Sequence, residues 1–487
     1  MAGVFGNFFF KSYNNLSKIA KGGLNISLIE VVRYLVEFLI ILVTARLLEP
    51  SDFGLIALAI TIISVIDAFT DLGIKTTIIQ NKKSKKQFLA SGWFLIIVRS
   101  LFLYLIIFFF AENISNFFSN HEIEIIIKIL AFRTILQSLV NPYQLLNIKE
   151  LNYKNYTLTM MCGILIKLFF IIPLAFILKN YWVLVFGSLI SPFVKVIISY
   201  YLDRRILIPK FSYRESIEIL KFSSWLLLSR ISQIFLQNLP RLIIGKLISV
   251  DFLGGFKIAE QFGYFSNNII KKFTTYITLP FFSKKFNNDK AFIKKSVVNY
   301  IVFIFSAILP ICLIVTLSSK ELILFLFGEK WLFIEHMLIY MMIYGSLLTF
   351  SNSIFVLIVA YGKPSKETLT RLVSLGVFCI YVIFNNSING ILNSILLSGF
   401  VLLIGAIMNL YLLKILDIHA VLKNFFIYNL PVLGIVMSFL TITKLEISET
   451  ASLFIFLIIS IISYLSISFI LYFFYKTGPF NYLKFLK

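Results

Sequence analysis

Long apolar stretches, separated by short polar breaks, constrain this chain more than any other feature. Fourteen of them follow one another along 487 residues, and each comes close to the roughly 20 residues that a helix needs to cross a bilayer. Soluble domains are about a quarter charged, and a single core stops growing at about 250 to 300 residues. Here 59% of the residues are hydrophobic and 14% are charged, so apolar residues must face lipid. The sequence predicts an all-α polytopic membrane protein.

Hydropathy gives the position of each predicted span. The spans run over residues 24–47, 54–79, 88–111, 124–147, 156–178, 181–202, 222–243, 252–279, 297–317, 333–361, 367–384, 391–413, 425–445 and 451–475. No connection is long enough to fold as a soluble domain. We expect an N-terminal lobe over residues 1–202, a cytoplasmic linker over 203–221, a C-terminal lobe over 222–413 and two extra helices within 414–487.

Basic residues alternate sharply between successive connections. One set of connections, which includes both termini, holds 26 lysines and arginines, whereas the other set holds six. Cytoplasmic loops of membrane proteins carry the excess of Lys and Arg. A missed or invented span would scramble the alternation, so both termini are expected on the cytoplasmic side.

The chain contains a predicted internal repeat. A shift of 200 residues pairs Arg46 with Lys246, Leu47 with Leu247, Leu48 with Ile248, Gly54 with Gly254 and Ala59 with Ala259. Both windows lie between the first and second spans of a six-span set. Parallel repeats with a substrate path between them are a known transporter design. We therefore expect two six-helix lobes, related as parallel repeats, followed by two further helices.

Many charges fall inside the predicted spans. A charge at the helix centre costs at least about 2.5 to 3.5 kcal/mol on insertion scales, so embedded charges normally face a wet cavity or a partner. The basic ones are Arg33, Lys75, Arg99, Lys128, Arg133, Lys167, Lys195, Arg230, Arg241, Lys257, Lys271, Lys272 and Arg371. The acidic ones are Glu30, Glu37, Asp67, Asp71, Glu124, Glu260 and Glu335. Six of the cations, Arg371 among them, lie near span ends and are expected to extend to the interface.

Helical spacing gathers the deeper charges into stripes, since residues at i, i+3, i+4 and i+7 share one face. Stripes occur in the first, second, seventh and eighth spans, the first two of each half. Self-pairing, as of Arg33 between Glu30 and Glu37, is an alternative for the first span. Thirteen cations against seven acids nevertheless leave a surplus of positive charge. We expect a polar cavity between the halves and an anionic substrate.

Four motifs form a recognisable set in order and spacing. They are ARLLEPSDFGLIALA from Ala45, DLG at Asp71 to Gly73, IGKLISVDFLGGFKIA from Ile244 and LFGEKW from Leu326 to Trp331. Together they resemble Wzx-type polysaccharide and O-antigen flippases, which belong to the multidrug/oligosaccharidyl-lipid/polysaccharide (MOP) exporter superfamily. The resemblance implies a MATE-like fold in which two six-helix lobes enclose a central cavity that opens alternately to each side.

The resemblance also implies a function and a setting. Such proteins move an undecaprenyl-diphosphate-linked oligosaccharide repeat unit across the bacterial cytoplasmic membrane, and they are transporters rather than enzymes. The expected partners are the lipid-linked glycan and membrane lipid, with polysaccharide polymerase machinery as a further candidate and no nucleic acid. We expect a monomer.

The candidate site residues follow from the embedded charges. Head-group binding is assigned to Arg33, Arg99, Arg230 and Lys257, with Lys167 as a further candidate. Three embedded carboxylates, Glu37, Asp67 and Glu260, could couple transport to H+ or Na+, or could be counter-ions of nearby cations. No other cofactor is expected. No metal site is expected either, because the three cysteines lie singly in different spans.

Three rival functions are considered, and each differs from a polysaccharide flippase in one feature. A multidrug exporter of the same fold carries organic cations, which surplus positive charge would repel. A polysaccharide polymerase or glycosyltransferase is expected to show a large outer loop or a soluble catalytic domain, and here the outer connections are short. A flippase for lipid-linked peptidoglycan precursors shares fold, anion and direction, so only substrate identity separates it from the favoured interpretation.

Overall fold

The chain is helical throughout the residues that the structure, a computed structural model, describes. These are residues 18–70, 73–80, 86–150, 152–274, 278–279, 282–283, 290–442 and 449–475. Helices and their connections account for all of these ranges, and no strand occurs in them. A helix satisfies its backbone hydrogen bonds within itself, as a lipid-embedded segment must. The prediction of an all-α membrane protein is confirmed.

The chain divides into two compact units, Met1–Gly254 and Gly255–Lys487. The helix over 213–247, whose apolar part is the seventh predicted span, lies in unit 1. The predicted lobes over 1–202 and 222–413 stay a prediction. Each unit is described below by itself.

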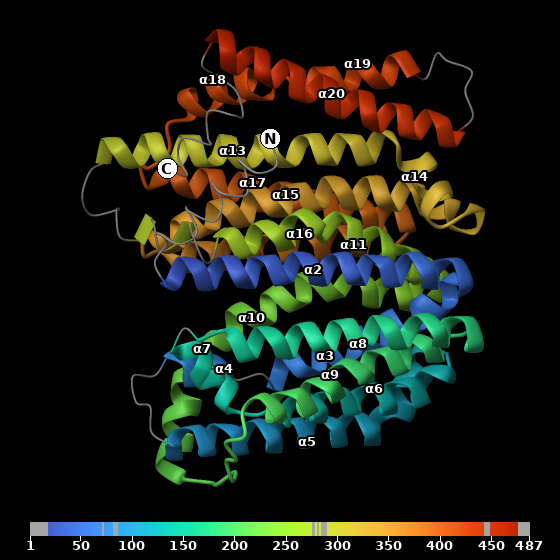
Figure 1. The fold of residues 1–487 in the computed structure, drawn as a ribbon, viewed down its shortest axis with the longest axis vertical. Helices are drawn as coiled ribbons and strands as arrows, with labels where there is room; N and C mark the ends of the chain where they lie inside the picture. Colours follow the sequence, from blue (N-terminus) through green and yellow to red (C-terminus); the bar gives the residue numbers. More distant parts are fainter. Residues whose placement is uncertain are drawn as a thin grey trace. The chain divides into compact units, whose positions relative to one another are not determined.

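Unit 1 is built from two helical hairpins and the helices that pack on them (Figure 1). Its helices are α2 (Lys18–Leu47), α3 (Pro50–Thr70), α4 (Ile74–Gln80), α5 (Lys86–Phe118), α6 (Glu122–Ser138), α7 (Tyr143–Lys149), α8 (Lys154–Leu178), α9 (Trp182–Leu202) and α10 (Tyr213–Leu247). The hairpins are α5 with α6 and α8 with α9. Helix α2 packs along α8, α10 packs along α3, and α6 joins the hairpins through its contact with α9.

Unit 2 is organised around one buried helix, α15 (Glu335–Ala360). The other helices are α11 (Val250–Phe273), whose residues up to Gly254 belong to unit 1, α13 (Lys290–Leu317), α14 (Ser319–Leu326), the 3-10 helix η2 (Glu329–Ile334), α16 (Pro364–Phe384), α17 (Ile388–Leu412), α18 (Ile418–Asn429), α19 (Val432–Ile442) and α20 (Glu449–Tyr475). Helices α13, α16 and α17 pack against α15. Of the apolar window that includes α15, 78% is buried, against 22% in α20, so α15 forms the core of this unit.

Nine helices of the described residues are long and apolar enough to cross a membrane, or ten if the bent pair α18 and α19 forms one span. Every one of the fourteen predicted spans coincides with helix over part or all of its length. Helix α6 falls below the count because it has only 17 residues. Helices α2, α10 and α11 also fall outside the count, and they carry three of the four predicted stripes. The number fourteen stays a prediction.

Three predicted spans are interrupted in the structure. In the second, α3 ends at Thr70 and α4 begins at Ile74, after Gly73 with φ 67°. In the fourth, α6 and α7 are separated by a turn in which the Asn141 side chain accepts a hydrogen bond from the backbone of Tyr143. In the thirteenth, α18 and α19 meet at a 41° bend beside Pro431. Glycine, asparagine and proline end helices locally, so the breaks follow from turn residues inside apolar runs.

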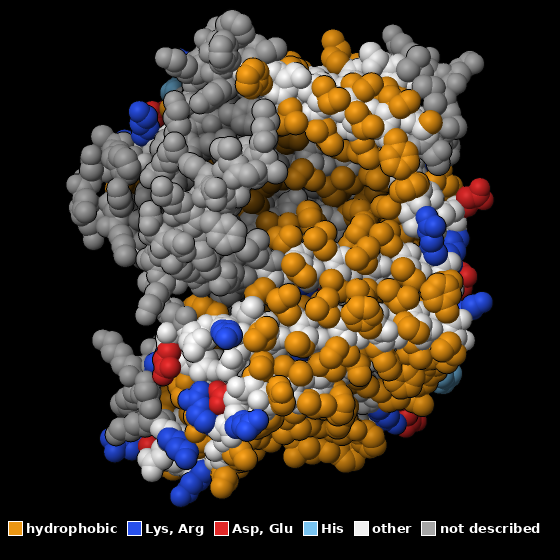
Figure 2. Space-filling view, in the orientation of Figure 1, with side chains coloured by type: hydrophobic (Ala, Val, Ile, Leu, Met, Phe, Trp, Pro, Cys, Tyr) orange, Lys and Arg blue, Asp and Glu red, His pale blue; other side chains and the backbone are white. Residues whose placement is uncertain are grey.

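The described surface is strongly apolar. Figure 2 shows hydrophobic side chains over much of the visible described surface. Phe109 of α5 is 73% exposed, and Phe384 of α16 is 86% exposed. Soluble proteins rarely expose large contiguous apolar patches, so these side chains are suited to contact lipid.

Candidate functional site

A cavity of about 530 Å³ lies within unit 1 and is lined by α2, α4 to α9 and the connection between α6 and α7. Its lining holds five cationic side chains but only one carboxylate. The cations are Arg33, Lys75, Arg133, Lys167 and Lys195, and the carboxylate is Glu37. Its remaining lining is apolar or neutral and polar. A cavity with this excess of positive charge inside a bundle of apolar helices can attract and hold an anion.

Close packing of the α8/α9 hairpin positions Lys195. The side chain of Lys195, on α9, lies across Gly163 of α8, where a Cβ would come within 2.8 Å of its Cγ and Cε atoms. Farther along the hairpin, a Cβ on Gly187 would come within 2.2 Å of the Ile171 side chain. The two glycines therefore allow α8 and α9 to approach closely, and the lysine stem lies in the space that Gly163 leaves.

Arg33 and Glu37 form an ion pair on one face of α2. Nη1 of Arg33 lies 3.0 Å from both carboxylate oxygens of Glu37, and the guanidinium lies 4.2 Å from the ring centroid of Tyr34. This i, i+4 spacing was visible in the sequence. Glu37 is thus a counter-ion of Arg33 in this structure.

Arg133, Lys167 and Lys195 form the strongly cationic part of the cavity. They come from α6, α8 and α9, and no ion pair involves any of them in the described part of the chain. Of the three, only Lys167 was assigned to the site from the sequence. One signal could have identified all three, because none has an acidic residue three or four positions away on its own helix. Embedded cations of this kind must be compensated from other helices, by water or by a ligand.

A second cavity of about 320 Å³ adjoins the first and shares Lys75, Ile96, Arg133, Gln137 and Ser138 with it. Arg99 of α5 and Asp67 of α3 line this second cavity and form an ion pair. Nε of Arg99 also donates a hydrogen bond of 3.3 Å to the Thr70 hydroxyl. The lining further includes Ser64, Ser100 and Thr134, so this space is rich in hydroxyl groups.

The remaining predicted site residues lie elsewhere. Lys257 and Glu260 belong to α11 in unit 2, where their charged atoms are 3.5 Å apart and the Glu260 side chain is 1% exposed. The side chain of Arg230 lies outside the described residues. The structure thus brings Arg33, Glu37 and Lys167 into one cavity and Arg99 and Asp67 into the adjoining one. Their roles, and a cavity between the predicted lobes, stay predictions.

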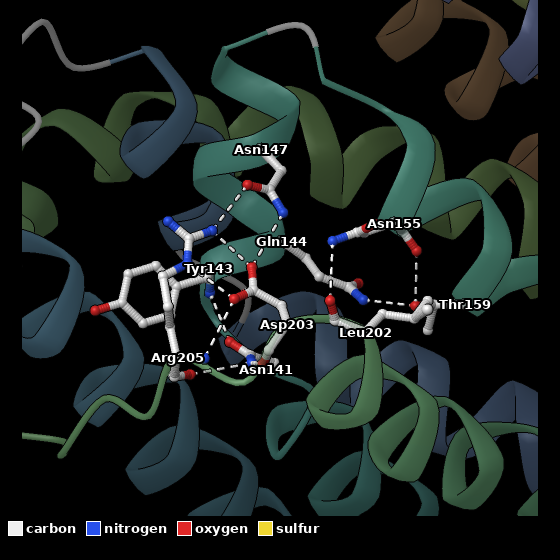
Figure 3. A network of polar contacts seen from close by, with 9 residues as sticks. All are labelled: Asn141, Tyr143, Gln144, Asn147, Asn155, Thr159, Leu202, Asp203 and Arg205. Atoms are coloured by element: carbon white, nitrogen blue, oxygen red, sulfur yellow. Dashed lines mark hydrogen bonds and ion pairs between the residues drawn. The ribbon is translucent and has the colours of Figure 1, made fainter.

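A polar network adjoins the large cavity through the lining residues Asn141 and Gln144 (Figure 3). Nδ2 of Asn141, a lining residue, donates a 2.8 Å hydrogen bond to the Asp203 carbonyl oxygen at the end of α9. The Asp203 carboxylate accepts hydrogen bonds from Arg205 at 2.6 and 2.8 Å and from Asn147 at 3.3 Å. These bonds, led by those from Arg205, hold the pKa of Asp203 below its ordinary value of 3.8. Arg205 also lies 4.3 Å from the Tyr143 ring centroid.

Two solved structures with similar folds are membrane transporters. A structure described as "Lipid II flippase MurJ, inward closed conformation" matches with a TM-score of 0.70, covering 92% of this chain and 98% of that one at 15% identity. An inward-facing multidrug resistance MATE family transporter of the MOP superfamily matches with a TM-score of 0.58. The match covers 78% of this chain and 95% of the transporter, at 15% identity. The chain has the fold of the MOP exporters, as the sequence predicted.

Sequence relatives narrow the class to a family. An uncharacterized membrane protein in the cps region of Klebsiella pneumoniae is 24% identical over 82% of this chain and 79% of its own. The lipopolysaccharide biosynthesis protein WzxC of Escherichia coli K12 is 22% identical over a region that covers 66% of this chain and 65% of WzxC. Residues 43–336 match the family model described as polysaccharide biosynthesis protein. The chain belongs to this polysaccharide biosynthesis family of transporters, and the predicted resemblance is confirmed.

Proposed function

We propose that this polysaccharide biosynthesis transporter is a flippase for an undecaprenyl-diphosphate-linked oligosaccharide. It moves the head group from the cytoplasmic to the outer leaflet of a bacterial cytoplasmic membrane by alternating access. Family membership and the MOP exporter fold support the transporter class. The substrate is inferred from the large cavity of unit 1.

One observation carries the choice of substrate. Arg133, Lys167 and Lys195 line one cavity, and no ion pair compensates them in the described ranges. A diphosphate diester carries two negative charges and several acceptor oxygens. Charge-assisted hydrogen bonds to lysine and arginine are about twice as strong as neutral ones. A diphosphate therefore fits this lining better than an uncharged sugar or an organic cation does.

The lipid part of such a substrate needs no protein site. Each CH₂ group taken out of lipid costs about 0.8 kcal/mol, so a long polyprenyl chain is held in the bilayer. The head group has the opposite preference because its charges cannot enter hydrocarbon unaided. A flippase has only to give the diphosphate and the sugars a polar path, which hydroxyl groups of the adjoining cavity can extend.

The two embedded carboxylates of this region serve in the proposal as counter-ions. Glu37 pairs with Arg33, and Asp67 pairs with Arg99. Each pair fixes the direction of a guanidinium at the cavity wall without adding net charge. Coupling of transport to H+ or Na+ through these groups or Glu260 stays a prediction.

Neutralising variants test the proposal. Lys167→Gln and Lys195→Gln are expressed in the source bacterium after deletion of its own copy of the gene, and surface polysaccharide and lipid-linked precursor are quantified. Loss of one charge-assisted bond, about 1.5 kcal/mol or more, predicts at least about a tenfold fall in export. Precursor should accumulate on the cytoplasmic side. Lys179→Gln is the matched control, because Lys179 caps α8 and is exposed.

Two results would contradict the proposal. Unchanged export in both variants, at normal protein levels in the membrane, would remove the head-group role of the cavity. Cell lysis on deletion of the gene, with surface polysaccharide retained, would point instead to a peptidoglycan precursor as the passenger.

A further inference from the structure

The large cavity offers more positive charge than a diphosphate needs. Arg133, Lys167 and Lys195 are three cations without an ion pair among the described residues, whereas a diphosphate diester supplies two negative charges. Arg33 is already compensated by Glu37. One of the three cations would thus stay uncompensated within a membrane-embedded protein, which is costly.

Arg133 differs from the two lysines by its place. It lines both cavities, as Lys75 of α4 does, whereas Lys167 and Lys195 line only the larger one. In the smaller cavity, Arg99 is paired with Asp67, and the remaining polar lining is Lys75 together with hydroxyl and amide side chains. A head group with its diphosphate near the two lysines would therefore place its first sugars beside Arg133 and among these hydroxyl groups.

The chemistry of the side chains favours the same division. A guanidinium is a planar fork that binds a carboxylate through two parallel hydrogen bonds, whereas an ammonium is a compact point charge. Lysines suit a diphosphate whose oxygens can rotate. An arginine at the junction of the two cavities suits a flat carboxylate held by a sugar ring.

We propose that the transported glycan is acidic, with a carboxylate on a sugar close to the diphosphate, and that Arg133 is the residue that recognises it. This inference rests on the proposed function, because it assumes that the diphosphate occupies the same cavity. The substrate class is thereby a polyprenyl-diphosphate-linked glycan that contains a uronic acid or a comparable acidic sugar.

A matched pair of ligands tests the inference. The full-length protein, purified in detergent, is titrated with farnesyl diphosphate-linked glucose and with farnesyl diphosphate-linked glucuronate, which differ only in one carboxylate. We expect the glucuronate ligand to bind about tenfold more tightly, as one charge-assisted contact provides. In Arg133→Gln the ratio of the two affinities should fall below about twofold, because the contact to the carboxylate is lost.

Further variants separate charge from geometry. Arg133→Lys keeps the charge but loses the fork, and we expect it to recover only part of the preference. Lys167→Gln should weaken the binding of both ligands by a similar factor, because it removes a contact to the diphosphate that both ligands contain. Lys179→Gln should change neither affinity. Binding of the glucose ligand by each variant also shows that it is folded.

The outcomes distinguish this inference from the proposed function. Equal affinity of the wild-type protein for both ligands would overturn the acidic-glycan inference and leave the flippase proposal standing. Binding of neither ligand would overturn the proposed function, and the inference with it. A preference for glucuronate that survives Arg133→Gln unchanged would overturn the role of Arg133.

Discussion

Gly54 and Gly254 meet at a reciprocal backbone contact within unit 1. A Cβ on Gly54 would lie 1.9 Å from the carbonyl oxygen of Val250, and a Cβ on Gly254 would lie 1.9 Å from the carbonyl oxygen of Pro50. The 200-residue shift of the predicted repeat converts each of these contacts into the other. A local two-fold axis produces such reciprocal contacts. The repeat, inferred from a few paired residues, thus has a structural counterpart at the point where its motifs are most alike.

We expect Gly54→Ala and Gly254→Ala each to destabilise the protein. Neither backbone can accept a methyl group without moving, and overpacking of this kind costs about 1 to 3 kcal/mol. Thermal unfolding of the purified protein in detergent provides the measurement. Gly376→Ala is the control, because Gly376 lies inside α16 with open space around its Cβ position. There alanine should be neutral or slightly stabilising. Equal stability of all three variants would refute the close crossing.

Asp203 predicts a pH dependence of stability. Its pKa lies below the ordinary value of 3.8, chiefly because Arg205 donates hydrogen bonds to it. A carboxylate with a lowered folded pKa stabilises the protein above its unfolded pKa, and this contribution is lost as the pH falls through the folded pKa. We expect Asp203→Asn to lower stability at pH 7 by about 1.5 to 3 kcal/mol. The difference from wild type should shrink as the pH falls below the ordinary value of 3.8 and through the lowered folded pKa.

The same titration has a matched control. Glu112 is an exposed carboxylate on α5, and Glu112→Gln should leave the unfolding temperature unchanged across the same pH range. A difference between Asp203→Asn and wild type that is as large at pH 3 as at pH 7 would show that packing, and not ionisation, accounts for it.

Local sequence patterns predicted the helices better than they predicted the site. A lipid-embedded run of apolar residues has few alternatives to a helix, so all fourteen predicted spans coincide with helix. The predicted site, by contrast, was derived from stripes of charged residues within single helices, which ignore charges on neighbouring helices. Arg133 and Lys195 have neutral polar neighbours but no second charge on the same face of their own helices, and they meet because α6 and α9 pack together. Which way a helix is rotated depends on packing between helices, which a single sequence does not display.

The position of the Arg371 side chain also depends on contacts between helices. Its place near a span end predicted that the side chain would extend to the interface, and this prediction is wrong. Arg371 is 7% exposed. Its guanidinium contacts Glu367 at 2.8 Å and the side-chain oxygen of Asn352 at 2.8 Å. The Asn352 amide in turn donates a 2.8 Å hydrogen bond to Asn267. The i, i+4 spacing of Glu367 and Arg371 on α16 was visible in the sequence, whereas the contact with Asn352 on α15 was not.

We expect Arg371→Leu to be among the most destabilising single changes in unit 2. Arg371 is buried but Glu367 is 26% exposed, so removing Arg371 leaves a partly solvated carboxylate and an unsatisfied Asn352 oxygen, at a cost of about 1.5 to 3 kcal/mol. The double variant Arg371→Leu/Glu367→Leu should recover much of this loss, because it removes both charges. Thermal unfolding of both variants provides the measurement. A double variant no more stable than Arg371→Leu would show that the hydrogen bond to Asn352, and not the pair with Glu367, is the main contribution.

Gly163 offers a test of how Lys195 is held in the cavity. A side chain at position 163 would occupy the space in which the Lys195 stem lies, since even a Cβ comes within 2.8 Å of Cγ and Cε. We therefore expect Gly163→Leu to weaken binding of farnesyl diphosphate-linked glucose about as much as Lys195→Gln does, which is about tenfold. If both changes act through the same ammonium group, the double variant should bind no more weakly than either single one. Gly376→Leu controls for the added bulk in a helix with free space. Additive losses in the double variant would mean that Gly163 acts by another route than the position of Lys195.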